Sequence, residues 1–92
     1  MDTSRFQQLQ RLARDYGDSK GVSTTLQMRA LQTSYNTTAV RIFVRVFRLV
    51  PGQPPLEYPA TAGYAPDAPD LEDKIMDAID VAAEALRPDK QA

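Results

Sequence analysis

From Val40 to Phe47, within residues 38–50, aliphatic residues alternate with arginine or phenylalanine. One set of alternate positions is aliphatic: Val40, Ile42, Val44 and Val46. The intervening positions are Arg41, Phe43, Arg45 and Phe47. Successive side chains of a β-strand point to opposite faces of its sheet. The pattern therefore predicts a strand with one aliphatic face, which needs a core, and one face of guanidinium groups and rings.

A second strand is predicted over residues 23–35, where apolar and polar positions also alternate. A three-residue turn at 35–37 would join the strands and set Arg29 opposite Phe43 and Ala30 opposite Ile42. A slip of one residue would move Arg29 to the aliphatic side, so we expect the former register. The hairpin adds Thr25, Gln27 and Arg29 of the first strand to this polar surface. We call this surface the Arg/Phe face, and its candidate partner-binding residues are Gln27, Arg29, Arg41, Phe43, Arg45 and Phe47.

Two amphipathic helices are predicted, one at each end of the chain. The first spans residues 4–16, and Gly17 can end it. Its apolar stripe is Phe6, Leu9, Leu12, Ala13 and Tyr16. The second spans residues 69–86, where Pro69 suits the first turn, Asp67 or Asp70 can cap it, and Pro88 stops it. Its apolar stripe is Leu71, Ile75, Ala78, Ile79, Ala82 and Leu86.

Residues 51–69 hold six of the seven prolines and are predicted to be a long connection. The sequence leaves open whether residues 56–64 add a short edge strand. Together these elements predict one α+β domain over residues 1–92, with an antiparallel hairpin and both helices on its aliphatic face. That arrangement leaves the Arg/Phe face uncovered.

The amino-acid composition excludes several kinds of catalytic and metal-binding chemistry. The 92 residues include no cysteine and no histidine, which removes disulfides, thiolate chemistry and the commonest general base and metal ligand. The sequence has no nucleotide-binding, hydrolase or zinc motif, so we expect no enzyme activity, no cofactor and no metal. It also lacks the roughly 20 consecutive apolar residues of a membrane-spanning helix, and we expect a cytoplasmic protein with no membrane contact.

Charge is divided unevenly along the chain. Residues 1–48 carry eight basic and three acidic groups, whereas residues 49–92 carry three basic and nine acidic groups. Such a division is typical of a polarised molecule with a charged partner, or of two halves that neutralise each other in the fold. Part of the acidity forms a row on the second helix, which is either a secondary acidic surface or a solvated helix face. The row is Asp73, Asp77, Asp80 and Glu84.

These features predict a non-enzymatic binding protein that uses the Arg/Phe face. Paired cations and rings suit a nucleic acid or a nucleoprotein complex, because phosphates and stacked bases need both. An acidic protein surface, or a homodimer built through this face, fits the same residues. A structural alternative buries Phe43 and Phe47 beneath the proline-rich segment while the arginines reach solvent.

A small domain without cysteine or catalytic motif resembles, as a type, the phage-encoded inhibitors of host defence such as anti-CRISPR proteins. The resemblance implies an inhibitor that occludes a binding site of its target and performs no chemistry. For a phage-encoded protein it also implies action in the cytoplasm of the host cell.

Overall fold

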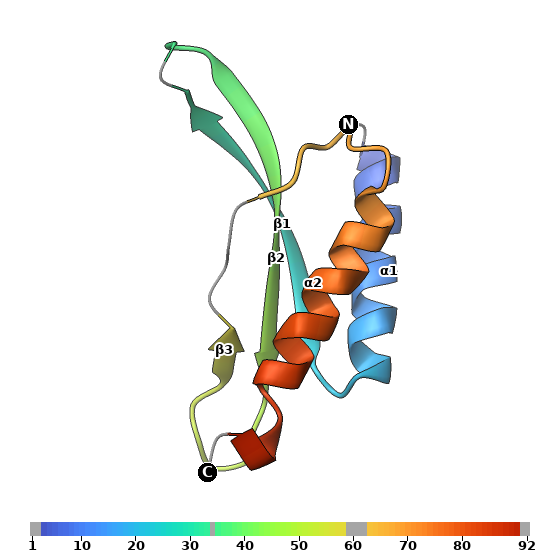
Figure 1. Ribbon diagram of the computed structural model, residues 1–92, viewed down its shortest axis with the longest axis vertical. Coiled ribbons are helices and arrows are strands. Elements are labelled where there is room, and N and C mark those ends of the chain that lie inside the picture. The colour runs from blue at the N-terminus through green and yellow to red at the C-terminus, as the bar shows by residue number, and fades with distance from the viewer. Residues whose placement is uncertain (1–2, 34, 59–62, 91–92) are drawn as a thin grey trace.

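The computed structural model describes residues 3–33, 35–58 and 63–90 and confirms a small α+β fold. Five main elements follow one another along the chain (Figure 1). They are helix α1 (Thr3–Ser19), strands β1 (Ser23–Gln32), β2 (Thr38–Arg48) and β3 (Leu56–Tyr58), and helix α2 (Leu71–Ala85). A short 3-10 turn, Pro88–Lys90, follows α2. No helix in the described part of the chain is long and apolar enough to cross a membrane.

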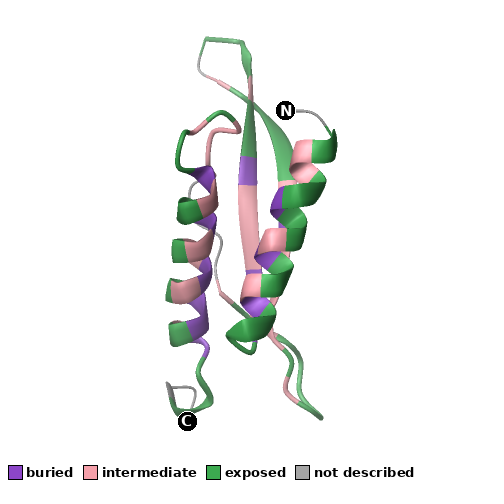
Figure 2. Ribbon diagram, turned by 90° about the vertical axis from the view of Figure 1, so that its right-hand side faces the viewer, coloured by how far each residue is buried: buried purple, intermediate pink, exposed green. Residues whose placement is uncertain are grey.

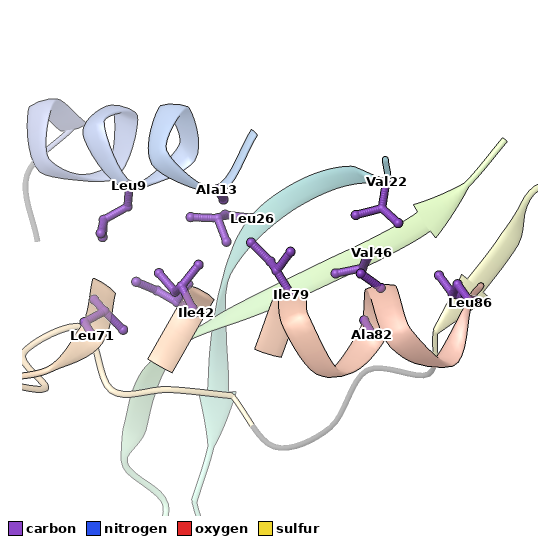
Figure 3. Close-up of a cluster of buried hydrophobic side chains, with 12 residues drawn as sticks. Leu9, Ala13, Val22, Leu26, Ile42, Val46, Leu71, Ile79, Ala82 and Leu86 are labelled. Carbon is purple, nitrogen blue, oxygen red and sulfur yellow. The ribbon is translucent and has the colours of Figure 1, made fainter. Parts of the chain in front are cut away.

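The sheet is antiparallel with strand order β1-β2-β3, and both helices lie on the same side of it (Figure 2). The core between the two layers collects apolar side chains from four elements and from Val22 before β1 (Figure 3). The strands contribute Leu26, Ile42 and Val46, all from the aliphatic face. The helices contribute Leu9, Ala13, Leu71, Ile75, Ile79, Ala82 and Ala83, and Leu86 joins them from the position directly after α2. The predicted packing of both helices on the aliphatic face is therefore correct.

The hairpin register differs from the predicted one by two residues. Arg29 lies opposite Arg41, and Ala30 lies opposite Val40. Thr33 and Thr37 close the turn, with the Thr33 N–H 2.7 Å from the Thr37 carbonyl oxygen. The third residue of such a loop takes a left-handed conformation, and here it is Asn36, with φ 61°. The predicted turn would have placed a β-branched threonine there, at a steric cost, whereas a two-residue shift keeps every side chain on its face.

Helix α1 continues past Gly17, so the predicted end at that residue is wrong. Gly21, with φ 77°, is the terminating glycine. The N–H of Val22 donates to the Gly17 carbonyl (3.0 Å), and the N–H of Gly21 donates to the Asp18 carbonyl (3.1 Å). This pair of bonds is the Schellman motif of a helix C-terminus. Gly17 is instead buried, and a Cβ there would lie 2.5 Å from Cγ2 of Thr24.

Helix α2 begins two residues later than predicted. Asp70 occupies the N-cap position but makes no side-chain capping bond, and its carboxylate lies 3.8 Å from Nζ of Lys74. At the other end, Nε of Arg48 donates to the Leu86 carbonyl over 2.7 Å. A cation at this place satisfies a terminal carbonyl and matches the negative end of the helix dipole.

The proline-rich connection does supply a third strand, which the sequence left open. β3 pairs with the end of β2, and Tyr64 forms an isolated bridge with Ile42 through two hydrogen bonds of 2.9 Å. Tyr58 and Tyr64 pack against the core, so both tyrosines hold the connection to the domain. Residues 59–62 lie outside the described ranges.

Candidate binding face of the sheet

The six candidate residues of the Arg/Phe face lie on the side of the sheet opposite the helices. Alternation along β1 and β2 puts them there, because Leu26, Ile42 and Val46 at the alternate positions of these strands enter the core. The sequence therefore brings together cations and rings from two neighbouring strands. Arg29 and Arg41 are exposed, and Gln27, Phe43, Arg45 and Phe47 are half-buried.

Arg29 and Arg41 lie directly opposite each other on β1 and β2. Neither side chain forms an ion pair within the described residues. Like charges in directly opposed positions destabilise a sheet by some tenths of a kcal/mol to about 1 kcal/mol. The fold thus carries two unneutralised guanidinium groups at a position where their repulsion opposes strand pairing.

Arg29 also contacts the neighbouring aromatic ring. Its guanidinium carbon lies 5.2 Å from the ring centroid of Phe43, within the range of a cation–π interaction. Nη2 of Arg29 donates to Oε1 of Gln27 over 3.0 Å. The guanidinium group therefore lies over the ring, and its remaining N–H groups are available to an acceptor.

Arg45, in contrast, is neutralised within the chain. Its Nε and Nη2 both lie 2.8 Å from Oε1 of Glu57 on β3. Glu57 pairs with Phe47 in the β2–β3 register and reaches this face for that reason. The Arg45–Glu57 pair was not predicted, because it depends on β3, which the sequence pattern left undecided. The alternation of apolar and charged residues in Leu56, Glu57 and Tyr58 is the sequence pattern that indicates this strand.

Gly63 covers one edge of Phe43. A Cβ at Gly63 would lie 2.9 Å from Cζ of Phe43 and 2.9 Å from Cβ of Arg41. The backbone of the proline-rich connection therefore packs closely on the face. The structural alternative predicted such a contact between this segment and Phe43. Arg29 and Arg41 nevertheless stay exposed beside that contact.

The four acidic residues of the predicted row on α2 differ in their contacts and exposure. Asp80 is half-buried and accepts a hydrogen bond from the Tyr16 phenol, whose oxygen lies 2.8 and 2.9 Å from the carboxylate oxygens. This bond is the main reason that the pKa of Tyr16 lies above its ordinary value of 10.0. Glu84 pairs with Arg87 over 3.3 Å. Asp73 and Asp77 are exposed.

The charge division along the chain is partly cancelled by pairs between its halves. Lys20 lies 3.5 Å from Asp80, Arg5 pairs with Glu72, and Arg45 pairs with Glu57. Glu72 sits in the first turn of α2, and bonds from its own backbone N–H and from Arg5 hold the pKa of its carboxyl below 4.5. The cations that these pairs leave without an acidic partner in the described ranges include Arg29 and Arg41.

Two hollows lie elsewhere on the surface. One, of about 360 Å³, is lined by Lys20, Arg48, Asp80, Ala83, Glu84 and Arg87, and its charged groups bond to one another or to a helix carbonyl. The other, of about 230 Å³, lies along α1 beside Arg11 and Arg14. No group of three or more acidic side chains in the described part of the chain is placed to hold a metal ion.

Comparisons of the chain with protein-family models, curated proteins and solved structures give no match.

Proposed function

We propose that this protein is a non-enzymatic binding protein whose Arg/Phe face contacts a nucleic acid, either free or within a nucleoprotein complex. The observation that carries the proposal is the direct opposition of Arg29 and Arg41. Their repulsion works against the hairpin, and a polyanion that binds both guanidinium groups would remove it.

The neighbouring ring favours a nucleic acid over an acidic protein surface. Unstacked bases bind on aromatic rings and on the planes of arginine side chains. Arg29 over Phe43 supplies such a plane, and Arg41 supplies a phosphate contact on the adjacent strand. An acidic protein would use the charges but would leave this stacking surface without a role. The proposed action is occlusion of a binding site, as in an inhibitor of the phage-encoded type.

Binding to labelled single-stranded oligonucleotides, measured by fluorescence anisotropy, tests the proposal. The logarithm of the binding constant should fall linearly with the logarithm of salt concentration, with a slope of about −0.7 for each phosphate contacted. Charge reversal at both sites, Arg29→Glu with Arg41→Glu, should weaken binding by roughly tenfold or more, since phosphate contacts supply much of the affinity.

The matched control is Arg11→Glu with Arg14→Glu. This variant makes the same change in net charge at two exposed arginines of α1, on the helix side of the molecule. It should keep most of the affinity, and circular dichroism should show both variants folded. Equal loss in the two variants would mean that net charge, not the Arg/Phe face, drives binding. Absence of binding at low salt would exclude free nucleic acid as the ligand. The same two double-arginine variants would then be tested for binding to an isolated nucleoprotein complex.

A further inference from the structure

The outer edge of β1 offers a second interaction surface, distinct from the Arg/Phe face. β1 is the terminal strand of the sheet and pairs only with β2 among the described residues. Its far half belongs to the part of the hairpin that rises beyond both helices (Figure 1). Residues 28–32 are all exposed there, in contrast to Leu26, which α1 and the core bury.

The hydrogen-bonding direction of this edge follows from one contact. Ile42 exchanges both of its backbone hydrogen bonds with Tyr64, on the β3 side of β2. Alternate residues of a strand bond in opposite directions, so Arg41 and Phe43 bond toward β1. Their partners in β1 are odd-numbered, and the even-numbered residues therefore aim N–H and C=O groups outward. These residues are Thr24, Leu26, Met28, Ala30 and Gln32.

The edge lacks the usual protection against pairing with another strand. Such protection consists of prolines, bulges, short length or charged side chains. β1 is ten residues long, contains no proline, pairs with β2 without a bulge, and has Arg29 as its one charged residue. Large apolar side chains are exposed on this arm: Met28 (41%), Leu31 (43%) and Val40 (42%).

We propose that β1 pairs antiparallel with β1 of a second copy, about a two-fold axis at Met28. The outward-bonding residues are even-numbered, so this axis sets Met28 opposite Met28 and Leu26 opposite Ala30 of the other copy. Arg29 then lies opposite Gln27, whose amide oxygen already accepts a hydrogen bond from Arg29 within one chain. The register is self-complementary and places no like charges opposite each other.

A second copy suits the edge for that reason. With the axis one residue further along the strand, the two Arg29 side chains would face each other, which like-charge repulsion disfavours. The axis at Met28 buries apolar side chains at the centre and keeps the two cations apart. A two-fold axis between antiparallel edge strands stands perpendicular to the sheet, so both pairs of helices stay on one side. The two Arg/Phe faces would then form one continuous surface.

Molecular mass in solution tests the proposal, by sedimentation equilibrium from micromolar to millimolar protein. The wild-type chain should reach twice the monomer mass of 10.2 kDa. Met28→Lys sets two ammonium groups against each other at the axis and should return the mass to that of the monomer. Val81→Lys is the matched control, because Val81 is also an exposed apolar residue (57%) but lies on α2. It should remain a dimer.

Met28→Pro separates edge pairing from a general effect of charge. The N–H of Met28 points outward, so proline removes a donor for the second copy and none for β2. It should abolish the dimer while circular dichroism shows the strands retained. A wild-type chain that stays monomeric throughout the concentration range would overturn the proposal. So would a dimer that survives both Met28 variants, or one that Arg41→Glu dissociates, because the Arg/Phe face would then be the interface. The dimer does not depend on nucleic-acid binding, and each can fail without the other.

Discussion

Arg45 is bound by Glu57: Nε and Nη2 of the guanidinium group both lie 2.8 Å from one carboxylate oxygen, across the β2–β3 pair. Within the part of the chain that the structure describes, Arg45 is the one arginine of the candidate set that forms an ion pair. Arg29 and Arg41, on the other side of Phe43, form no ion pair with the described residues and are available to the anionic partner that we propose.

Glu57→Gln should strengthen binding of an anionic ligand. The substitution removes a negative charge from the Arg/Phe face and releases Arg45, and an exposed ion pair of this kind contributes roughly 0.2–1 kcal/mol, so affinity should rise about two- to fivefold. The salt dependence should steepen if Arg45 reaches a further phosphate. Oligonucleotide anisotropy measures both. Asp73→Asn is the control, with the same charge change on the exposed side of α2, and an equal gain there would refute a local effect.

Arg41→Gln should stabilise the fold and weaken binding at the same time. The variant relieves the repulsion with Arg29, which is worth some tenths of a kcal/mol to about 1 kcal/mol, and keeps the Cβ on which Gly63 packs. Urea denaturation measures the free energy of unfolding, and anisotropy measures the affinity. Arg14→Gln on α1 should change neither by a comparable amount. A loss of stability in the Arg41 variant would contradict the repulsion.

Gly17→Ala should destabilise the protein, although alanine normally favours a helix over glycine. The new Cβ would lie 2.5 Å from Cγ2 of Thr24 and 3.2 Å from the Val22 carbonyl oxygen. Overpacking of this kind costs about 1–3 kcal/mol, which exceeds the gain in helix propensity. Adding Thr24→Ser removes the clashing methyl group and should recover part of the loss in thermal denaturation. A Gly17→Ala variant more stable than wild type would show that α1 does not pack on β1 in this way.

Thr24→Val should raise stability. Oγ1 of Thr24 is buried and has no hydrogen-bond partner in the described part of the chain, and an unsatisfied buried hydroxyl costs about 1–3 kcal/mol. Valine has the same branched shape without the hydroxyl. The midpoint of urea denaturation should increase with an unchanged slope. A decrease would mean that water or an undescribed residue satisfies the hydroxyl.

Stability should fall in acid partly through Glu72. Bonds from its own backbone N–H and from Arg5 hold the pKa of its carboxyl below 4.5 in the folded chain. A carboxyl with a lowered folded-state pKa contributes stability above its ordinary pKa and loses it as pH falls through the folded value. The wild-type advantage over Glu72→Gln should therefore be present at neutral pH and shrink below about pH 4.5. Urea denaturation at several pH values measures this difference. Asp77→Asn is the matched control, and an advantage that is constant with pH would contradict the assignment.

The amino-acid sequence by itself determined which side chains share a face. The alternation of aliphatic residues with arginine and phenylalanine from Val40 to Phe47 determines the two faces of β2. The helical spacing of Leu9 with Ala13, and of Ile75 with Ile79, predicts the helices that cover the aliphatic face. Local periodicity suffices for this because burial of apolar side chains is the dominant favourable term in folding. The fold class, both helices and the position of the Arg/Phe face opposite the helices were predictable for that reason.

Only the tertiary structure decided which residues meet across the strands. The hairpin register depends on Asn36, which takes the left-handed position of the turn, and that shift of two residues set Arg29 against Arg41. Periodicity is unchanged by such a shift, so the pattern could not reveal it. The Arg45–Glu57 pair likewise depends on a three-residue strand held by long-range pairing with β2. Faces follow from local spacing, whereas partners across a sheet follow from turn geometry and contacts between distant segments.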